Sequence, residues 1–227
     1  MYLFFDTETT GLPKNYKAPV TDTNNWPRLV QIAWELYDED EKLLESKMYI
    51  VKPVEFEIPT VASKIHNVTH KRAMEEGKDL IFVLNEFRNT MLKAKYLIAH
   101  NISFDEKIIG CEFIRMKMEK LPFKLIKIDT MKTTVKFCQL PAKWGFKWPK
   151  LNELHEKLFD VGFDGAHDAL VDVKALAKCY FELTKRNVLE NYSKKETGPS
   201  EFKTLFGNST EPKTDESLDH WDNLINN

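Results

Sequence analysis

The chain has 227 residues, of which 42% are hydrophobic and 12% aromatic, and a chain of this size can bury one substantial core. Its formal net charge of -2 excludes a general electrostatic attraction to polyanions. No apolar run is long enough to span a bilayer and no basic-then-apolar leader opens the chain, so we expect a soluble, cytoplasmic protein with no membrane partner.

The first predicted element is a strand that leads into two acidic residues. Residues 2–5 form an uninterrupted apolar run, which is typical of a buried strand. Asp6 and Glu8 follow at i and i+2, and in an extended chain such residues point to the same side of a sheet. Gly11 then permits a turn. The two acids are therefore expected where open α/β sheets tend to bind their ligands.

Two interpretations of this acidic pair are open. Carboxylates so close together repel each other unless a proton or a cation lies between them, so Asp6 and Glu8 form either a solvated pair or a hard-metal site. The same spacing recurs at three further places, which we interpret as solvated turns and strand faces: Asp38/Asp40, Glu39/Glu41 and Glu55/Glu57. Only Asp6 and Glu8 follow a wholly apolar run.

The next segments predict a long loop and a hairpin. Residues 12–27 are rich in Pro, Asn, Thr and Lys, and they form either a functional loop or a tolerated surface insertion. Residues 29–38 and 43–51 are predicted strands, joined by a charged turn at 39–42. The chain thus begins with three successive strands.

The remainder alternates helices and strands up to about residue 188. The predicted helices cover residues 61–66, 80–92, 103–118, 130–137, 151–159 and 168–186, and the predicted strands cover 96–99 and 125–128. Residues 141–149 form an aromatic, basic loop. A hairpin followed by this alternation predicts an α/β domain over residues 1–188, with a mixed sheet flanked by helices.

The three cysteines do not form a recognisable metal or disulfide pattern. Cys111, Cys138 and Cys179 are odd in number and far apart in the sequence. Their spacing matches neither a zinc site nor a disulfide framework, so we predict three reduced residues in the core.

The last segment differs in composition from the domain. From residue 190 onward, eight acidic residues accompany four lysines, and periodicity fades. We expect residues 189–227 to be a polar, acidic, flexible tail. Residues 201–206 faintly resemble a clamp-binding peptide without its usual initial glutamine, and residues 217–224 fit a small amphipathic helix that docks on the domain or a partner.

Three further residues are candidates for the site of the acidic pair. Asp105 begins a predicted helix, where the helix dipole alone is a sufficient reason for an acid. Asp172 lies on the inward side of the last helix, an unusual place for a solvated carboxylate. His167 precedes it by five residues, and Asp168 is better explained as a helix N-cap.

Taken together, these residues resemble the motifs of the DEDDh family of 3′-to-5′ exonucleases, which includes the proofreading subunit of bacterial DNA polymerase III. Asp6-Thr-Glu8 resembles its Asp-x-Glu motif, Asn101 to Asp105 its Asn-x-x-Phe-Asp motif, and His167 to Asp172 its His-x4-Asp motif. The resemblance covers residues 2–186. It implies a ribonuclease-H-like fold with a five-stranded mixed sheet.

The resemblance also implies a chemistry. Two divalent ions, Mg²⁺ or Mn²⁺, would be held by four carboxylates, with Asp6 bridging both, Glu8 and Asp172 holding the ion that activates water, and Asp105 helping to hold the other. His167 would be the general base. A competing acid, Asp129, is assigned a structural or supporting role.

Substrate contacts are implied in the same way. Leu12 would be a wedge between the last two bases, Thr9 at the Gly11 turn would supply a main-chain donor, and Phe104 would pack near the sugar beside Asn101 of the same motif. His66 would either touch the terminal phosphate or cap a helix end. Four aromatic residues are either stacking platforms or ordinary packing residues: Trp26, Trp144, Phe146 and Trp148.

We therefore expect a 3′-to-5′ exonuclease that acts on single-stranded or frayed ends, with DNA favoured over RNA. The alternatives are an exoribonuclease of the same family and a non-catalytic module that binds nucleic-acid ends or a polymerase. A sliding clamp is a further possible partner, and no pattern reports the oligomeric state. The chain departs from the simplest family members at residues 14–26 and 144–149, on which substrate preference would depend.

Overall fold

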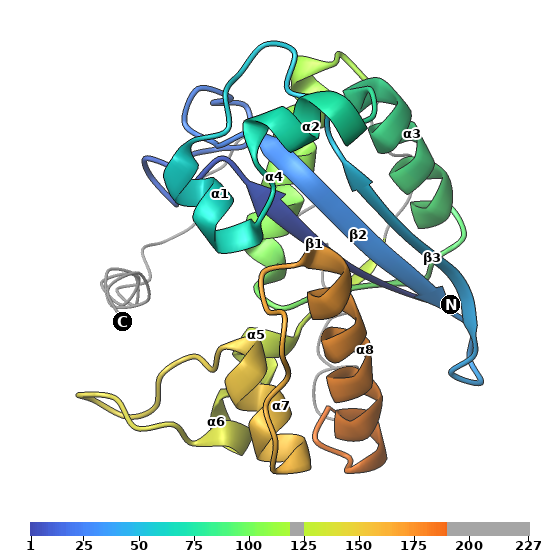
Figure 1. Cartoon of the computed structure of the whole chain (residues 1–227). Coiled ribbons are helices and arrows are strands. Elements are labelled where there is room, and N and C mark those ends of the chain that lie inside the picture. The colour runs from blue at the N-terminus through green and yellow to red at the C-terminus, as the bar shows by residue number, and fades with distance from the viewer. Residues whose placement is uncertain (119–124, 190–227) are drawn as a thin grey trace.

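A five-stranded mixed sheet forms the centre of the computed structural model, which describes residues 1–118 and 125–189 (Figure 1). The strands are β1 (Tyr2–Thr9), β2 (Leu29–Tyr37), β3 (Leu43–Ile50), β4 (Tyr96–Ala99) and β5 (Ile126–Asp129). Their order is β3-β2-β1-β4-β5. The first three strands are antiparallel neighbours, whereas β1, β4 and β5 are parallel. The predicted fold class is confirmed.

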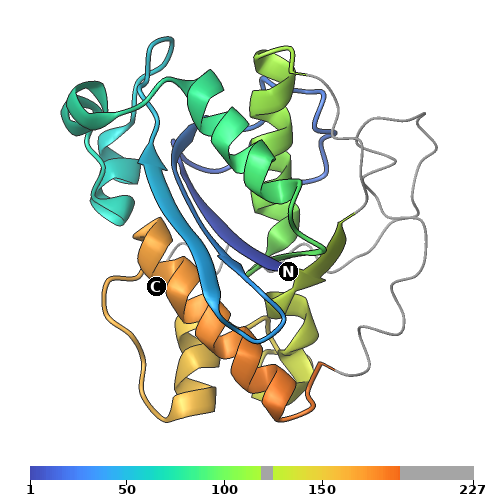
Figure 2. The same cartoon turned by 90° about the vertical axis from the view of Figure 1, so that its right-hand side faces the viewer.

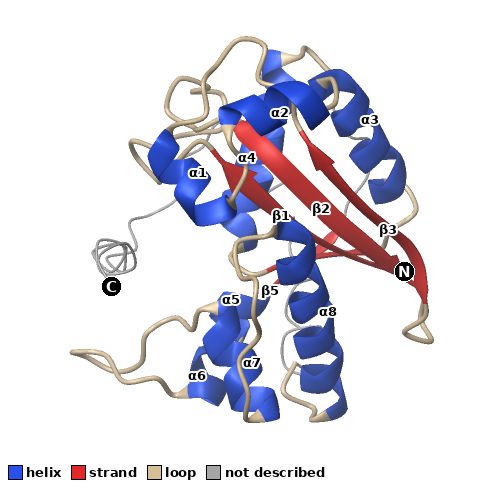
Figure 3. Ribbon diagram, viewed as in Figure 1, coloured by secondary structure: helices blue, strands red, loops and turns tan. Residues whose placement is uncertain are grey.

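Helices cover both faces of the sheet (Figures 2 and 3). They are α1 (Thr60–His66), α2 (His70–Glu76), α3 (Leu80–Met91), α4 (Ile102–Arg115), α5 (Thr130–Thr133), α6 (Val135–Cys138), α7 (Leu151–Phe159) and α8 (Ala169–Lys185). Helices α3 and α4 lie on one face, and α7 and α8 lie on the other. Residues 10–28 form a loop between β1 and β2, as predicted.

The alternation of side chains along β1 supplies both cores. Phe5 packs with Phe87 of α3 on one face, while Phe4 packs with Tyr180 of α8 on the other. Because the side-chain period of a strand is two, Asp6 and Glu8 follow Phe4 to the α8 face. The packing of β1 therefore determines which helix the two acids meet.

The parallel ladder between β1 and β4 is short. It begins at Tyr2–Tyr96 and ends at Phe4–Ile98, so Asp6 and the residues after it lie beyond the last β1–β4 pair. On the other side, β1 stays paired with β2 as far as Thr9. One edge of β1 thus opens where the acidic residues begin.

Apart from differences of up to three residues at the ends of other elements, two predicted elements differ from the structure, and α2 lies where no helix was predicted. The first strand continues to Thr9, so Asp6 and Glu8 lie within β1 instead of after it. The helix predicted over residues 130–137 is divided into α5 and α6 at Thr134, whose φ of -101° and ψ of 4° are not helical. The Thr133 and Thr134 hydroxyls donate to main-chain oxygens one turn back, an arrangement that often bends helices.

The cysteines, the apolar character of the helices and the C-terminal tail were also subjects of the sequence analysis. All three cysteines are free and buried, as predicted. In the part of the chain that the structure describes, no helix is long and apolar enough to cross a membrane. The predicted tail, with its clamp-binding and amphipathic segments at 201–206 and 217–224, lies outside the described residues from position 190 onward.

Candidate active site

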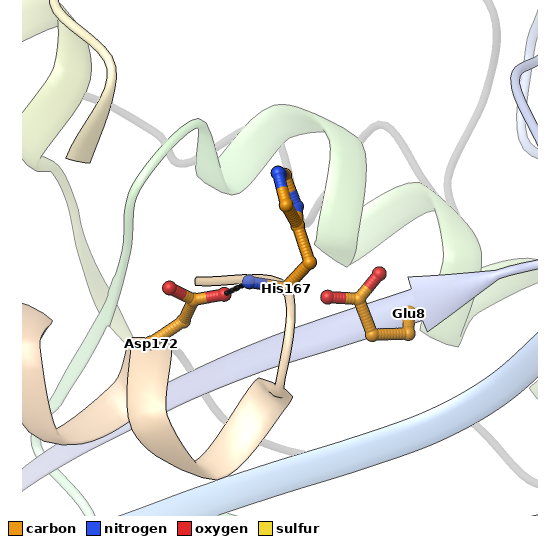
Figure 4. A group of neighbouring side chains, drawn as sticks. All are labelled: Glu8, His167 and Asp172. Carbon is orange, nitrogen blue, oxygen red and sulfur yellow. Dashed lines mark hydrogen bonds between the residues drawn. The ribbon is translucent and has the colours of Figure 1, made fainter. Parts of the chain in front are cut away.

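Three of the predicted site residues come together where β1 meets the start of α8. One ligand atom each from Glu8, His167 and Asp172 lies within 4.8 Å of the others. Figure 4 shows Glu8 at the end of β1 and Asp172 on the first turn of α8, with their carboxylates turned toward each other and His167 between them. Residues more than 150 positions apart in the sequence therefore share one site.

The segment before α8 is held in place by its own acids. His167 has a φ of 70°, a left-handed conformation that histidine adopts more readily than most residues, and its main-chain N–H donates to Asp172 Oδ2 at 2.8 Å. Asp168 caps α8 by accepting from the N–H groups of Leu170 and Val171. Asp168 is thus the predicted N-cap, and Asp172 orients the residue that precedes the helix.

Asp105 reaches the site from the opposite face of the sheet. It is 3% exposed in the first turn of α4, and its Oδ1 accepts from both the N–H of Thr7 at 3.1 Å and the Thr7 hydroxyl at 2.7 Å. The pairing of β1 with β4 ends before Thr7, so the Thr7 N–H donates to Asp105 instead of to a main-chain carbonyl of β4. This contact across 98 residues fixes the carboxylate beside Asp6 and Glu8.

The four acids perturb one another strongly. Burial, followed by the nearby charge of Asp105, raises the pKa of Asp6 well above its usual range. Burial and the Asp172 carboxylate raise the pKa of Glu8 to about 9. Burial also raises the pKa of Asp105 to about 7 and that of Asp172 to about 6, although hydrogen bonds to these two carboxylates oppose the shift. Perturbation of this kind is typical of a functional site.

This donor set fits hard divalent cations. Within the described ranges, no lysine or arginine forms an ion pair with Asp6, Glu8, Asp105 or Asp172. Carboxylate oxygens are the ligands that Mg²⁺ and Mn²⁺ prefer, and a cation among them would relieve the repulsion that raises their pKa values. Asp6 and Asp105 lie outside the 4.8 Å group but interact electrostatically with it.

The histidine in this site has a lowered pKa. Desolvation of the imidazole, and secondarily the positive charge of Lys150, lower the pKa of His167 below its usual value of 6.5. The ring is consequently neutral near pH 7 and able to accept a proton.

Two contacts that sequence reasoning missed support these residues. Thr7 was overlooked because it points away from its acidic neighbours, and only the tertiary structure shows that it meets Asp105. Gln31 is 1% exposed on β2, opposite Glu8, and its Oε1 accepts from the N–H of Ala169 at 3.3 Å. A Gln within the otherwise apolar run of residues 29–34 is the one signal that could have identified it.

Asp129 has the predicted structural role. It is the N-cap of α5, and its Oδ1 accepts from the N–H groups of Asn101, Met131 and Lys132. Asp129 therefore fixes the start of α4, and in this way it helps to position Asp105.

The predicted substrate-binding residues surround the end of β1. Leu12 is 50% exposed, as a wedge requires, and Gly11 has a φ of 148°, which other residues rarely adopt. Thr9 is held by its hydroxyl, which donates to the Gly11 carbonyl at 2.7 Å. Asn101 precedes α4 in a left-handed conformation, three residues before the partly buried Phe104.

His66 lies at the end of α1, close to the candidate site. Its Nδ1 accepts from the N–H of Val68 at 3.2 Å, which fits the helix-end interpretation. Burial lowers the pKa of this ring, with a smaller contribution from His167, and hydrogen bonding with the main chain of Thr9 opposes the shift. The ring therefore lies near both the end of β1 and His167.

The four aromatic candidates separate into different environments. Trp26 is 3% exposed and belongs to the core, whereas Trp144 and Phe146 are 86% and 48% exposed. Trp148 is partly buried and lines a pocket beside α4. Packing accounts for Trp26, but not for the exposed pair.

Replacing the threonine that holds Asp105 tests how the site is built. In Thr7→Val the volume is kept and the hydroxyl is lost, so the pKa of Asp105 is expected to rise further, since that hydrogen bond lowers it. Mn²⁺ affinity near pH 7 should fall about tenfold, and the difference from the parent should shrink at higher pH. Isothermal titration with Mn²⁺ between pH 6 and 9 measures this.

The control for this prediction is Thr60→Val, at an exposed position of α1. A Thr7→Val variant whose Mn²⁺ affinity follows the parent at every pH would contradict the role of the hydroxyl.

Comparison with known proteins gives three results. The family model described as Exonuclease (RNase T) matches residues 3–180. The chain is 25% identical over 212 residues to DNA polymerase III PolC-type of Mycoplasmopsis pulmonis (strain UAB CTIP), and the match covers 92% of this chain and 13% of that protein. The fold is similar to that of E. coli Exonuclease I in complex with a dT13 oligonucleotide, with a TM-score of 0.67 and 19% identity.

The structural match covers 90% of this chain and 45% of E. coli Exonuclease I. Exonuclease I from Methylocaldum szegediense is similar with a TM-score of 0.65 and 19% identity over 85% of this chain and 42% of that one. The chain therefore spans less than half of these structures and 13% of the polymerase.

Proposed function

The chain belongs to the exonuclease family described by the RNase T model, and from this premise we propose that it is a metal-dependent 3′-to-5′ exonuclease. The substrate would be a single-stranded or frayed end, with DNA favoured over RNA, and the products would be nucleoside monophosphates. Residues 1–188 would form the catalytic domain. The observation that supports this best is the convergence of Glu8, Asp172 and His167 within 4.8 Å, beside Asp6 and Asp105.

The four carboxylates would hold two Mg²⁺ or Mn²⁺ ions. The residues that would hold these ions are Asp6, Glu8, Asp105 and Asp172. When bound, such ions lower the pKa of water, neutralise charge on the phosphoryl oxygens and stabilise the leaving oxygen.

The residues of the chain itself perform the remaining tasks. His167, neutral near pH 7, would take the proton of the attacking water at its imidazole. Thr7 holds Asp105 in a single orientation, and Asp172 holds the backbone of His167. Leu12, Phe104 and His66 would position the terminal nucleotide.

A non-catalytic module is the competing function from a different class. A module that has lost its activity would be expected to lack at least one of the acids or the histidine, and all five are present. The arrangement of these five residues favours an enzyme.

One digestion series tests the function. The protein is incubated with Mg²⁺ and oligonucleotides labelled at the 5′ end: single-stranded DNA, matched RNA, and paired or mismatched duplexes. We expect a ladder that shortens from the 3′ end, fastest on single-stranded DNA and on the mismatched duplex. A 3′-phosphorothioate linkage should slow the reaction. Shortening from the 5′ end, seen with 3′-labelled strands, or no digestion of any substrate would contradict the proposal.

A further inference from the structure

A pocket beside the candidate active site is lined mainly by aromatic and basic residues. Its volume is about 210 Å³, below the range of roughly 300–1,000 Å³ typical of sites for whole drug-sized ligands and suited to one ring system. Six of its lining residues are aromatic or basic: Tyr16, Trp26, Phe104, Lys107, Lys132 and Trp148. They come from the loop after β1, from α4, from α5 and from the segment before α7.

The pocket and the active site share one boundary. Phe104 lines the pocket, and the next residue, Asp105, is bound to Thr7 between the two acids of β1. His100, just before α4, connects to the other wall, since its Nε2 donates to the Pro149 carbonyl at 2.8 Å, next to Trp148. Burial lowers the pKa of His100 to about 4, so this ring is neutral and the connection persists at neutral pH.

The charge of the pocket is opposite to that of the active site. Its lining includes Lys107 and Lys132 and no carboxylate. The Lys107 ammonium donates to the Tyr16 carbonyl at 2.9 Å and lies 4.8 Å from the centre of the Trp26 ring. The Lys132 ammonium lies 3.9 Å from Asp129 Oδ2, and the Lys132 side chain is 52% exposed. Aromatic faces beside lysines suit a base and the phosphate attached to it.

The loop that supplies one wall is held firmly. The Trp26 indole donates to the Pro19 carbonyl at 3.2 Å, and Arg115 of α4 donates to the Trp26 carbonyl at 2.8 Å. The Asn25 side chain exchanges two hydrogen bonds with the main chain of Asn15. A wall fixed before binding reduces the entropy lost when a ligand is bound.

We propose that this pocket binds a nucleotide of the substrate strand upstream of the one being removed, with Trp148 stacking on its base and Lys132 contacting its phosphate. This inference depends on the proposed function, since it extends the same strand from the active site. It gives residues 14–26 and 144–149, where the chain departs from the simplest family members, a role in holding single strands.

A binding series tests the proposal. Fluorescent oligothymidylates of two to six nucleotides, with a phosphorothioate at the terminal linkage to slow hydrolysis, are titrated in Mg²⁺. We expect the parent affinity to rise as the strand lengthens beyond two nucleotides. Trp148→Ala should weaken binding of the longer strands about tenfold, and Trp148→Phe, which keeps a ring, should recover most of the loss.

The lysine gives a readout that a structural role would not change. In Lys132→Ala the slope of log affinity against log salt should fall by about 0.7, the value for one lost phosphate contact on a single strand. Lys136→Ala, at an exposed position of α6 outside the pocket lining, should bind with the parent slope and affinity. Parent-like binding by both Trp148→Ala and Lys132→Ala would overturn the proposal.

A second substrate separates this proposal from the proposed function. The p-nitrophenyl ester of thymidine 5′-monophosphate carries a single nucleotide and reports on the chemistry alone. Trp148→Ala should lower the ratio of kcat/KM on oligothymidylate to kcat/KM on the ester about tenfold, and an unchanged ratio would contradict the pocket. If the parent hydrolyses neither substrate, the proposed function fails, while the binding series still tests the pocket.

Discussion

Replacing Asp6 with asparagine is expected to lower kcat by about three orders of magnitude or more. Burial and the charges of the neighbouring acids raise the pKa of Asp6, and as a proposed ligand of both ions it would influence both. Loss of several kcal/mol of transition-state stabilisation corresponds to this change in rate. Release of nucleotide from a single-stranded oligonucleotide at saturating Mg²⁺ measures it.

The same variant should be more stable than the parent when chelator has removed metal. Burial and the charge of Asp105 raise the pKa of Asp6, so the ionised carboxylate destabilises the folded state at neutral pH, and the neutral amide removes that cost. We expect Tm to rise by a few degrees in chelator, with less further increase on adding Mn²⁺ than in the parent.

The thermal stability of the metal-free parent protein is expected to fall as pH rises. Acids whose pKa is raised on folding contribute stability below their unfolded pKa, near 4, and lose it as pH rises through the folded pKa. These values are about 6 for Asp172, about 7 for Asp105 and about 9 for Glu8. In chelator, Tm of the parent should therefore fall between pH 5 and pH 9, and by less in Asp6→Asn.

Asp168→Asn is the matched control for Asp6→Asn. It removes a negative charge from the same region, but asparagine is an equally good N-cap for α8, so folding and most of the activity should remain. An Asp6→Asn protein with at least a tenth of the parent kcat would contradict the proposed site.

Removing the imidazole of His167 is the second large effect. His167→Asn should lower kcat by about 10²- to 10⁴-fold, the usual contribution of a general base, while Mn²⁺ binding changes little. Asparagine tolerates the left-handed backbone of this position, so the chain before α8 keeps its conformation and its N–H bond to Asp172.

The pH profile identifies the role of His167. Because its pKa is lowered, the acidic limb of the parent kcat profile should lie below pH 6.5, and His167→Asn should lose that limb. His70→Ala, at a histidine of α2, controls for the loss of an imidazole elsewhere. Equal kcat for His167→Asn and the parent would reassign the base.

Much of the fold was predictable because local patterns decide it. The apolar run before Asp6, the hairpin at residues 29–51 and the helical periodicity of residues 80–92 each agree with the element they form. The division of α5 from α6 was not predicted, since it depends on threonine hydroxyls that bond to main-chain oxygens.

For the candidate site, the sequence identified which residues take part but not how they contact one another. Spacing along β1 placed Asp6 and Glu8 on one face, and the positions of Asp105, His167 and Asp172 in the chain, together with the motif resemblance, added these three. Contacts between distant segments could not be read in this way. Thr7 contacts Asp105 only because the pairing of β1 with β4 ends at Phe4. The sequence does not show where the pairing of two strands ends.

Because the β1–β4 ladder ends early, Asp105 and Asp6 contribute differently to the stability of the fold. The Thr7 main-chain N–H donates to Asp105. Losing this carboxylate would leave a buried donor without a hydrogen bond and lower the free energy of unfolding by about 1–3 kcal/mol. Among residues 1–118 and 125–189, no donor is recorded on the Asp6 carboxylate, so losing Asp6 mainly relieves repulsion. In a related domain that no longer needs catalysis, we therefore expect substitutions of Asp6 to be tolerated, whereas Asp105 should be retained because the fold depends on it.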